Sequence, residues 1–504
     1  MSSQAIAAID LGTMSCRAEI FSLDGEPLGR HSLEYPLDTP VPDAAEQDAE
    51  TWWQAACTCL REALKASSLS GEDVLALGFS CQGHSWVPTD ADFRPLRPAF
   101  TWLDRRSAPY ADRLLIAMGA TYWGRLAGKT PGPWHMLSQL LWLHDHEPEA
   151  LASARHLLFC QDFLIARLTG KPVTDYTTAA ATLFFDISAN AWDAEELEHH
   201  QLDAALLPQV VGSGTVVGSL TPQAARATGL STRTLVVTGA QDQKCAALGA
   251  GLVPGIATAS LGTATAIEAL LDRPTFNPEV PIPCFPYLDT GTWVLEAAIS
   301  TTGGAVNWLR EAFRQIAPDL SYSDLMACAA EAAPGSNGVI FFPYPAGAGM
   351  PHMRFDASAA FAGMSLATGI TDLARAVLEA CAYEIATALA AMTDAGCAIN
   401  RVHAFGGGVR SRLWTEIIAA TLNIPLFTCR EAETALRGAA MLAARGALPA
   451  DRSAPLQDAL RSPADPVSVT TDLQATYAKL FAHYVRAREQ YWPFQDSLKQ
   501  EEEQ

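Results

Sequence analysis

Two stretches of the sequence, 250 residues apart, follow the same pattern. AIAAIDLGTMSCRAEIF covers residues 5–21, and GIATASLGTATAIEALL covers residues 255–271. Each runs from an apolar segment through Leu-Gly-Thr into a second apolar segment, which predicts a strand, a glycine turn and another strand. A tripeptide can recur by chance, but the same strand context once in each half of the chain favours a duplicated domain. We therefore expect two related domains.

The rest of the chain predicts an α/β architecture in both halves. Further strands are predicted, with helical patterns between them, at residues 74–80, 234–242, 338–344 and 401–408. At 504 residues the chain exceeds the usual size of a single hydrophobic core, and the segment AALGAGLVPG has the glycines and proline of a connection between domains. We expect an N-terminal domain at 1–245, a C-terminal domain at 246–485 and a polar tail at 486–504.

Charge and hydropathy argue against several classes of partner. The 34 Lys and Arg residues against 55 Asp and Glu give a net charge of −21, which repels a phosphate backbone, so we expect no nucleic-acid partner. The sequence has no run of about eighteen apolar residues and no export signal, so we expect a cytoplasmic protein that does not bind membranes. The eleven cysteines include no C-x-x-C pair, which disfavours a disulfide framework and a zinc site.

The two repeated turns contain Gly12-Thr13 and Gly262-Thr263. Glycine lets a ligand approach the backbone, successive N–H groups there form a concave anion site, and the threonine hydroxyls add donors. The sequence has no Walker motif and no G-x-G-x-x-G after a predicted strand, which disfavours the two commonest nucleotide folds. Two turns that face each other would hold a polyphosphate from both sides, so we expect a nucleotide in a cleft between the domains.

Two further groups of glycines stand at the predicted starts of helices. Gly303 and Gly304 lie in STTGGAVNWLREAF, and backbone amides at a helix start can bind phosphate. In HAFGGGVRSRLW, a predicted strand ends in Gly406, Gly407 and Gly408 before an amphipathic helix. That turn suits an adenosine lying against bare backbone, and close strand–helix packing is the alternative explanation of the same glycines.

Asp10 and Asp242 are carboxylates at predicted strand ends, Asp10 beside the first glycine turn. A carboxylate is tolerated among phosphate oxygens when a cation, here Mg²⁺, lies between them, so we expect Asp10, together with Asp242, to hold the metal. In phosphoryl transfer the acceptor hydroxyl needs a base, and Asp242 fits that catalytic role. The alternative is that Asp242 only caps the helix that follows it.

These elements occur in the order found in the FGGY carbohydrate kinases, which the chain resembles over nearly its whole length. IDLGT and SLGTA resemble the two phosphate motifs, AFGGGVRSRLW the adenosine motif, and GAQDQKCAALGAG the segment with the catalytic aspartate. The second signature of the family is matched at Ala359, Phe361, Gly363, Met364, Asp372, Leu373, Ala376, Val377, Leu378 and Glu379. The resemblance implies two actin-like, ribonuclease H-like ATPase domains with a cleft between them, ATP and Mg²⁺ as cofactors, and Arg410 in the nucleotide site.

The segment GFSCQGHSWVPTDADFRPLRPAFTWLDRRS, residues 78–107, is similar to the sugar loop of the xylulose kinases within this family. There, a Gln-Met-His triplet precedes a Trp-x-Asp-x-Arg element. An aromatic face suits the C–H side of a polyol, and amide, imidazole, carboxylate and guanidinium groups suit its hydroxyls. The resemblance implies a substrate site made of Gln82, Gly83, His84, Trp102, Asp104 and Arg106, with Asp242 and Gln243 from the catalytic segment.

Three residues depart from the family pattern. Gly83 stands where methionine is usual, which removes one wall of the sugar site unless Trp86 fills it. Gln139 and Gln161 stand where lysines are usual. Their loss matters little if those lysines are structural, and it alters specificity if they touch the substrate.

The resemblance implies an ATP-dependent kinase of a small ketose, with D-xylulose first and ribulose, gluconate or glycerol as alternatives. Its partners would be the sugar and ATP, and a homodimer is left open. The rival from another class is an actin-like or chaperone-like ATPase that moves a protein partner, which would share the phosphate loops but should lack a polyol loop. A sugar-sensing regulator with the same fold is disfavoured by the presence of Asp242.

Overall fold

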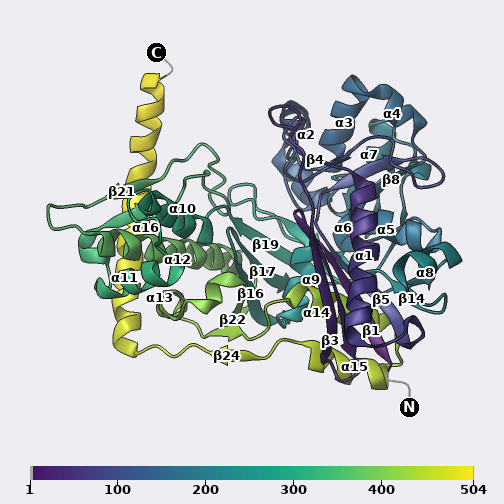
Figure 1. Cartoon of the computed structure of the whole chain (residues 1–504). Helices are drawn as coiled ribbons and strands as arrows, with labels where there is room; N and C mark the ends of the chain where they lie inside the picture. The colour runs from purple at the N-terminus through teal and green to yellow at the C-terminus, as the bar shows by residue number, and fades with distance from the viewer. Residues whose placement is uncertain (1–3, 503–504) are drawn as a thin grey trace.

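The computed structural model describes residues 4–502 and has two lobes, each built around a mixed sheet of seven strands (Figure 1). The first sheet has the order β13-β14-β5-β1-β2-β3, with β15 paired to β5, and the second has the order β18-β19-β17-β16-β22-β23-β24. The first contains β1 (Ala5–Leu11), β2 (Ser15–Ser22), β3 (Pro27–Glu34), β5 (Val74–Cys81), β13 (Val216–Ser219), β14 (Leu235–Val237) and β15 (Ala240–Gln241). The second contains β16 (Gly255–Leu261), β17 (Thr265–Leu271), β18 (Cys284–Pro286), β19 (Trp293–Ile299), β22 (Ile399–Phe405), β23 (Leu426–Cys429) and β24 (Ala464–Pro466).

The two sheets repeat one topology. In the first, β1 runs antiparallel to β2 and parallel to β5, and in the second, β16 runs antiparallel to β17 and parallel to β22. Five strands of each sheet have equivalent places, in the orders β3-β2-β1-β5-β14 and β19-β17-β16-β22-β23. The predicted α/β fold with two actin-like domains is thereby confirmed, and each Leu-Gly-Thr lies at the turn between the first two strands of its sheet.

Two predicted strands are shorter in the structure. The strand expected at 234–242 is interrupted after β14, because the Thr238 hydroxyl donates to the Gly212 carbonyl (2.9 Å) and the chain leaves the ladder before β15. The strand expected at 338–344 is reduced to β20 (Ile340–Phe342), which pairs with β21 (Ala360–Ala362) outside the main sheet. Pro343 has no N–H with which to extend it.

One helix of the second half of the chain packs against the first sheet. α14 (Thr434–Ala447) contacts β1, β5 and the catalytic-segment helix α9 (Asp242–Gly249), and α15 (Ala450–Leu460) follows it. A Cβ on Gly438 would lie 1.9 Å from the Cys245 carbonyl oxygen, so the close approach of α14 to α9 requires glycine. The expected division at 245/246 therefore does not coincide with a break in packing.

The upper part of the first lobe in Figure 1 is an inserted subdomain that carries the predicted sugar loop. Its sheet has the order β4-β7-β6-β8, and its core contains Trp86, Phe100 and Trp123. Its elements are β4 (Glu46–Gln47), β6 (Trp86–Thr89), β7 (Ala99–Phe100), β8 (His156–Phe159), α2 (Ala108–Ala127), α3 (Met136–His146), α4 (Pro148–Ser153) and α7 (Ala194–His199). The other elements of the first lobe are α1 (Ala49–Ser67), α5 (Cys160–Thr169), β9 (Val173–Asp175), α6 (Tyr176–Ala179), β10 (Phe185–Asp186), β11 (Ala191–Trp192), β12 (Gln209–Val211) and α8 (Pro222–Thr228).

Helix α12 (Ile370–Asp394) is the central helix of the second lobe. It is long and apolar enough to cross a membrane by length and composition, but 78% of its most apolar window is buried inside the protein, as in the core helix of a globular domain. The other helices of this lobe are α10 (Gly303–Arg314), α11 (Tyr322–Glu331), α13 (Arg412–Leu422) and α16 (Thr471–Glu502).

The predicted polar tail from residue 486 onward is the continuation of α16. Its first residues pack on the second lobe: the Arg488 guanidinium pairs with the buried carboxylate of Glu384 (3.0 Å), and the Tyr491 ring stacks on Phe342 at 4.3 Å between centroids. The Tyr491 hydroxyl also donates to the Ser358 carbonyl (2.8 Å). These residues of the expected tail therefore pack on the second lobe, because different faces of one long helix carry its polar and its packed side chains.

Candidate active site

The first glycine turn joins β1 to β2 and is closed by its own backbone. The Gly12 amide donates to the Ser15 carbonyl (2.9 Å), and the Tyr35 hydroxyl donates to the Gly12 carbonyl. Gly12 and Thr13 remain partly exposed on the turn. The turn is thus a preformed, accessible loop of the kind that can hold phosphate oxygens.

Asp10 precedes this turn at the end of β1 and is buried. The Ser80 hydroxyl donates to its Oδ1 (2.7 Å), and burial raises the pKa of the Asp10 carboxyl above its usual value. The Arg17 guanidinium, which is opposite Asp10 in the β1–β2 register, lies 3.7 Å from Oδ2. Arg17 is a charged residue beside the first phosphate loop that the sequence reasoning missed, although its place within an apolar strand was a usable signal.

The second glycine turn, between β16 and β17, is seated on the start of α10. The Gly303 amide donates to the Gly262 carbonyl (3.1 Å), and the Gly304 amide donates to the Thr263 carbonyl (2.8 Å). A Cβ on Gly303 would come within 2.4 Å of the Gly262 carbonyl oxygen, so only glycine permits this contact. The Gly303 and Gly304 amides, which were expected to bind phosphate, therefore bond the carbonyls of the second phosphate loop. This supports a role for Gly303 and Gly304 in positioning that loop.

The glycine triplet after β22 lies beside the second turn. Gly406 has a φ of 90°, and a Cβ on Gly408 would meet the Leu261 Cβ at 2.8 Å, so these two glycines permit close packing. A Cβ on Gly407 would meet nothing within 4 Å, and Arg410 is exposed. Gly406 and Gly408 thus support the explanation by close strand–helix packing. Gly407 faces open space where a nucleoside could lie, which supports the explanation by an adenosine site.

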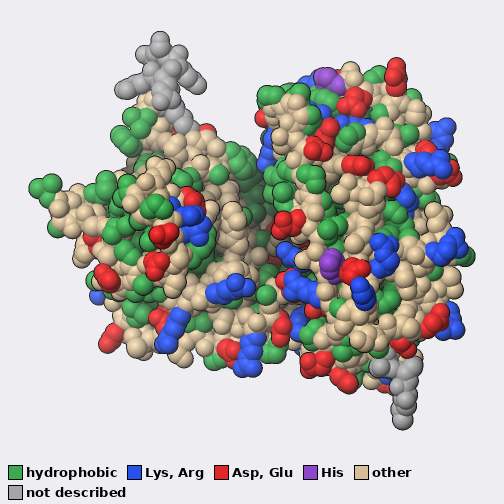
Figure 2. Space-filling view, in the orientation of Figure 1, with side chains coloured by type: hydrophobic (Ala, Val, Ile, Leu, Met, Phe, Trp, Pro, Cys, Tyr) green, Lys and Arg blue, Asp and Glu red, His purple; other side chains and the backbone are tan. Residues whose placement is uncertain are grey.

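Asp242 is the first residue of α9, partly buried, and its Oδ1 accepts a hydrogen bond from the Gln243 amide (2.8 Å). Burial, and after it the negative charge of Asp10, raises the pKa of the Asp242 carboxyl to about 7. The two carboxylates lie at one edge of the first sheet, because Ser80 of β5 pairs with Asp10 of β1 on one side and with Ala240 of β15, two residues before Asp242, on the other. The surface between the lobes is hollowed (Figure 2).

The carboxylates of Asp10 and Asp242 fit a Mg²⁺ ion that binds together with a nucleotide. Among residues 4–502 no group of three or more His, Cys, Asp and Glu side chains could hold a metal by itself. Mg²⁺ usually takes one or two carboxylates and completes its coordination with phosphate oxygens and waters, which matches the pair Asp10 and Asp242.

The triplet Gln82-Gly83-His84 follows β5 and presents unpartnered polar atoms. The Gln82 amide donates to Gln47 Oε1 (3.1 Å), but Gln82 Oε1 and His84 Nδ1 are buried without a hydrogen-bond partner. His84 has a left-handed φ of 60°, a conformation that non-glycine residues adopt at a cost of about 1–3 kcal/mol and that clusters at functional sites. Burial lowers the pKa of His84 to about 3, so its ring is neutral and can accept a hydrogen bond.

The space beside Gly83 is filled by a side chain other than Trp86. The Gln241 side chain fills it, with its Cδ 3.1 Å from where a Gly83 Cβ would stand, and the Gln241 amide donates to the Thr177 carbonyl (2.8 Å). Trp86 is fully buried in the subdomain core instead, so it does not replace the missing wall.

Trp102 reaches from the sugar loop to the first phosphate loop. Its indole N–H donates to the Thr13 hydroxyl (2.8 Å), and 39% of the residue is exposed. The exposed indole therefore stands beside the first phosphate loop, and its role as an aromatic wall of the sugar site stays a prediction.

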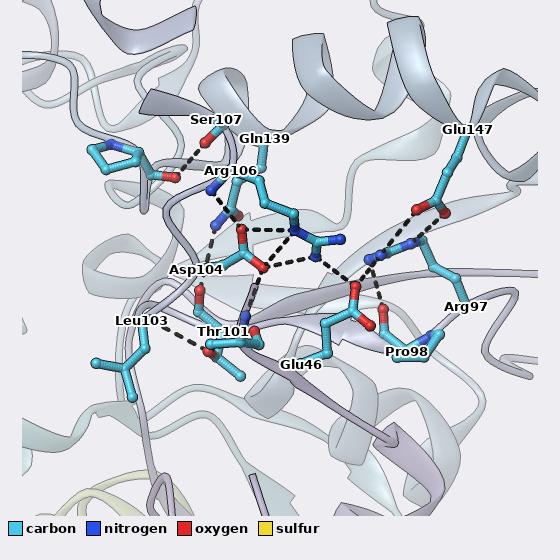
Figure 3. A network of polar contacts seen from close by, with 12 residues as sticks. Glu46, Arg97, Pro98, Thr101, Leu103, Asp104, Arg106, Ser107, Gln139 and Glu147 are labelled. Atoms are coloured by element: carbon cyan, nitrogen blue, oxygen red, sulfur yellow. Dashed lines mark hydrogen bonds and ion pairs between the residues drawn. The ribbon is translucent and has the colours of Figure 1, made fainter. Parts of the chain in front are cut away.

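Asp104 and Arg106 belong to a buried network rather than to an open surface (Figure 3). The Asp104 carboxylate is fully buried, accepts from the Ala45 amide (3.0 Å) and pairs with the Arg106 guanidinium (2.7 Å). Glu46 then joins Arg106 to Arg97. The structure thus does not bring these two predicted substrate residues to the site, because their polar atoms are used to shape the loop that carries Trp102.

The two glutamines that replace family lysines are also structural. Both are fully buried. Gln139 Oε1 accepts from the Trp86 indole N–H (2.6 Å), while Gln161 Oε1 accepts from the Gly239 amide (3.0 Å) and its amide donates to Asp175 (3.0 Å). These departures from the family pattern are therefore explained by packing inside the first lobe.

Two buried lysines near His84 were missed by the sequence reasoning. Lys244, on α9, forms ion pairs with Glu296 and Glu268, and Lys129, after α2, lies against the same aromatic ring, that of Phe285. Lys244 stands between small residues of the catalytic segment, which was a usable signal, whereas nothing around Lys129 in the sequence marks it.

Known proteins match both halves of the chain. The N-terminal domain of the FGGY family of carbohydrate kinases matches residues 5–249, and its C-terminal domain matches residues 257–447. The chain is 30% identical over 412 residues to the xylulose kinase of Escherichia coli K12, covering 82% of this chain and 83% of that protein. It is also 30% identical over 475 residues to a glycerol kinase of Janthinobacterium, covering 88% and 90% of the two chains.

A solved structure agrees with this assignment. The gluconate kinase from Lactobacillus acidophilus is 25% identical and superposes with a TM-score of 0.90, covering 97% of this chain and 98% of that chain. These similar proteins are named for different acceptors. The chain belongs to the FGGY family of carbohydrate kinases and is an ATP-dependent sugar phosphotransferase.

Proposed function

We propose that the protein phosphorylates D-xylulose to D-xylulose 5-phosphate with ATP and Mg²⁺. The observation that carries the proposal is the position of Asp242 at the start of α9, at the same edge of the first sheet as Asp10 beside the first phosphate loop. The Gln82–His84 triplet and Trp102 supply the polar and aromatic groups that a ketose requires. We further propose a cytoplasmic protein whose partners are the sugar and ATP, with a homodimer compatible with this role.

In this proposal each group of residues has a separate role in phosphoryl transfer. The acceptor hydroxyl oxygen forms a bond to the γ-phosphorus, the bond to the bridging oxygen of ADP breaks, and Asp242 takes the hydroxyl proton. The Gly12 and Gly262 amides close their own turns, so these turns hold phosphate oxygens through the backbone N–H and hydroxyl groups of Thr13 and Thr263. When bound, Mg²⁺ neutralises charge between the carboxylates of Asp10 and Asp242 and the phosphates.

The raised pKa of Asp242 predicts a pH dependence. Because its pKa is about 7 in the free protein, Asp242 is protonated and unable to accept a proton below that pH, so kcat/KM should fall as pH decreases through about 7. The measurement is kcat/KM for xylulose over about pH 5.5 to 9 with a coupled ADP assay whose coupling enzymes are in excess. A flat profile down to about pH 5.5 would contradict the assignment of Asp242 as the base.

The choice of acceptor is tested with a panel of xylulose, ribulose, gluconate and glycerol. Glycerol leaves several of the polar groups around Gln82 and His84 unpaired, at about 1–3 kcal/mol each, so we expect kcat/KM for xylulose to exceed that for glycerol by about tenfold or more. If glycerol exceeds both pentuloses, the substrate proposal is wrong while the kinase assignment stands. If no sugar stimulates ATP consumption, the proposed function itself fails.

Gluconate is the second candidate because of one observation. A buried amine, Lys129, lies near His84 without a carboxylate partner among the described residues, which is the environment that an acidic acceptor would complement. The carboxylate of gluconate would provide the negative charge that this amine lacks, whereas xylulose and glycerol are neutral.

A further inference from the structure

Lys129 is buried with few partners. The residue is 2% exposed, its Nζ donates to the Ala180 carbonyl (2.8 Å), and it lies 3.6 Å from the centre of the Phe285 ring. Within the described part of the chain, Nζ has no other hydrogen bond and no ion pair. An ammonium group has three donors, and a buried charge is costly unless it is paired, so this amine lacks an anion.

The neighbouring charges do not supply that anion. The Lys244 ammonium lies 3.9 Å from the centre of the same Phe285 ring. It forms an ion pair with Glu296, so this carboxylate is already engaged. The adjacent Glu268 carboxylate also lies against Lys244, 3.4 Å from its Nζ, and burial raises the pKa of Glu268 to about 8. Burial, and next the charge of Lys244, lowers the pKa of Lys129 well below its usual value, so the charged form of this amine is disfavoured until an anion binds beside it.

The unpaired amine lies on the acceptor side of the proposed site. The carbonyl that it bonds belongs to Ala180, and the backbone of the next residue, Ala181, lies close enough to His84 to affect its pKa. The His84 ring is 6.5 Å from that of Phe285 and carries a buried Nδ1 without a partner. The Lys129 amine, which lacks acceptors, and the His84 imidazole, whose Nδ1 lacks a hydrogen bond, thus both lie beside the Phe285 ring.

We propose that Lys129 is a specificity-determining residue that binds a carboxylate on the acceptor, so that the site takes sugar acids, such as aldonates, in preference to the corresponding neutral polyols. A carboxylate supplies both the missing negative charge and several lone pairs, whereas a hydroxymethyl group supplies no charge and a single, weaker acceptor oxygen. The inference rests on the proposed function and develops its second candidate, gluconate, in place of the neutral xylulose, because it assumes that the acceptor binds at the Gln82–His84 triplet.

The test compares two ligands that differ only at one carbon. D-Gluconate has a carboxylate at C1 where D-glucitol has a hydroxymethyl group, and the equilibrium affinity of each for the full-length protein is measured by titration calorimetry without ATP. We expect wild type to bind gluconate about tenfold tighter than glucitol or more, since hydrogen bonds to charged groups are the strong ones. Lys129→Met should abolish this preference, mainly by weakening gluconate binding. Lys171→Met, which removes an exposed lysine, should retain it.

Several outcomes would overturn the inference. Equal affinity of the wild-type protein for gluconate and glucitol would contradict the inference. A Lys129→Met protein that loses affinity for both ligands to the same extent would also contradict it. Thermal unfolding of Lys129→Met should show an unchanged or raised Tm, because an unpaired buried amine is replaced by an apolar group. Lys129→Arg keeps the charge and should therefore keep part of the preference for gluconate over glucitol. Failure of the proposed function would appear separately, as ATP consumption that no sugar stimulates.

Discussion

Asp242→Asn is expected to lower kcat by about a hundredfold or more while leaving the fold and acceptor binding intact. Asparagine keeps the size of the side chain and can still accept the hydrogen bond from the Gln243 amide, but it cannot take the proton of the acceptor hydroxyl. The loss should appear in kcat rather than in KM, because a proton acceptor acts in the transition state. The measurement is steady-state kinetics with whichever acceptor of the panel has the highest kcat/KM.

The control is Asp24→Asn, which makes the same chemical change on the exposed turn between β2 and β3. Its kcat should equal that of wild type, and circular dichroism should show the same fold for both variants. An Asp242→Asn enzyme with kcat near wild type would remove Asp242 from the chemistry and leave it as the cap of α9. A rise in KM alone would assign it to binding.

Asp104→Ala is expected to destabilise the protein by about 3–5 kcal/mol, which is the usual effect of removing one partner of a buried ion pair. The substitution leaves the guanidinium of Arg106 with Glu46 alone and deprives the Ala45 amide of its acceptor. The measurement is the shift in the midpoint of thermal or urea unfolding of the first lobe. We expect the folded fraction to keep a KM for sugar close to that of wild type, since Asp104 does not face the site.

Trp102→Phe is the matched change in the same segment. It removes the hydrogen bond to the Thr13 hydroxyl from a residue that is 39% exposed, so stability should change little while KM for the acceptor or for ATP rises. If Asp104→Ala instead left stability unchanged and raised KM for sugar, Asp104 would be a substrate residue, as the resemblance to the xylulose kinases implied.

The sequence by itself determined the duplicated architecture and the chemistry at the turns. Apolar runs, Leu-Gly-Thr turns and the glycines before a helix are local patterns, and local patterns predict strands and turns because they act through neighbouring backbone dihedral angles. For the same reason, the apolar run that precedes Asp10 is sufficient to predict that this carboxylate ends a strand beside the first glycine turn. The family resemblance then ordered these elements into a sugar kinase, and the matches of both domains confirm that order.

Only the tertiary structure decided which polar residues face the site. Trp102 and Asp104 are two residues apart, yet the indole bonds Thr13, 89 residues away, while the carboxylate accepts from Ala45, 59 residues away, and is buried. The amides of Gly303 and Gly304 likewise meet the carbonyls of the second phosphate loop, and the Gln241 side chain fills the space beside Gly83. Lys129 is marked by no local pattern, and its significance comes from the anion that its buried surroundings lack. The partner of a buried polar group is set by packing between distant segments, which a one-dimensional pattern does not record.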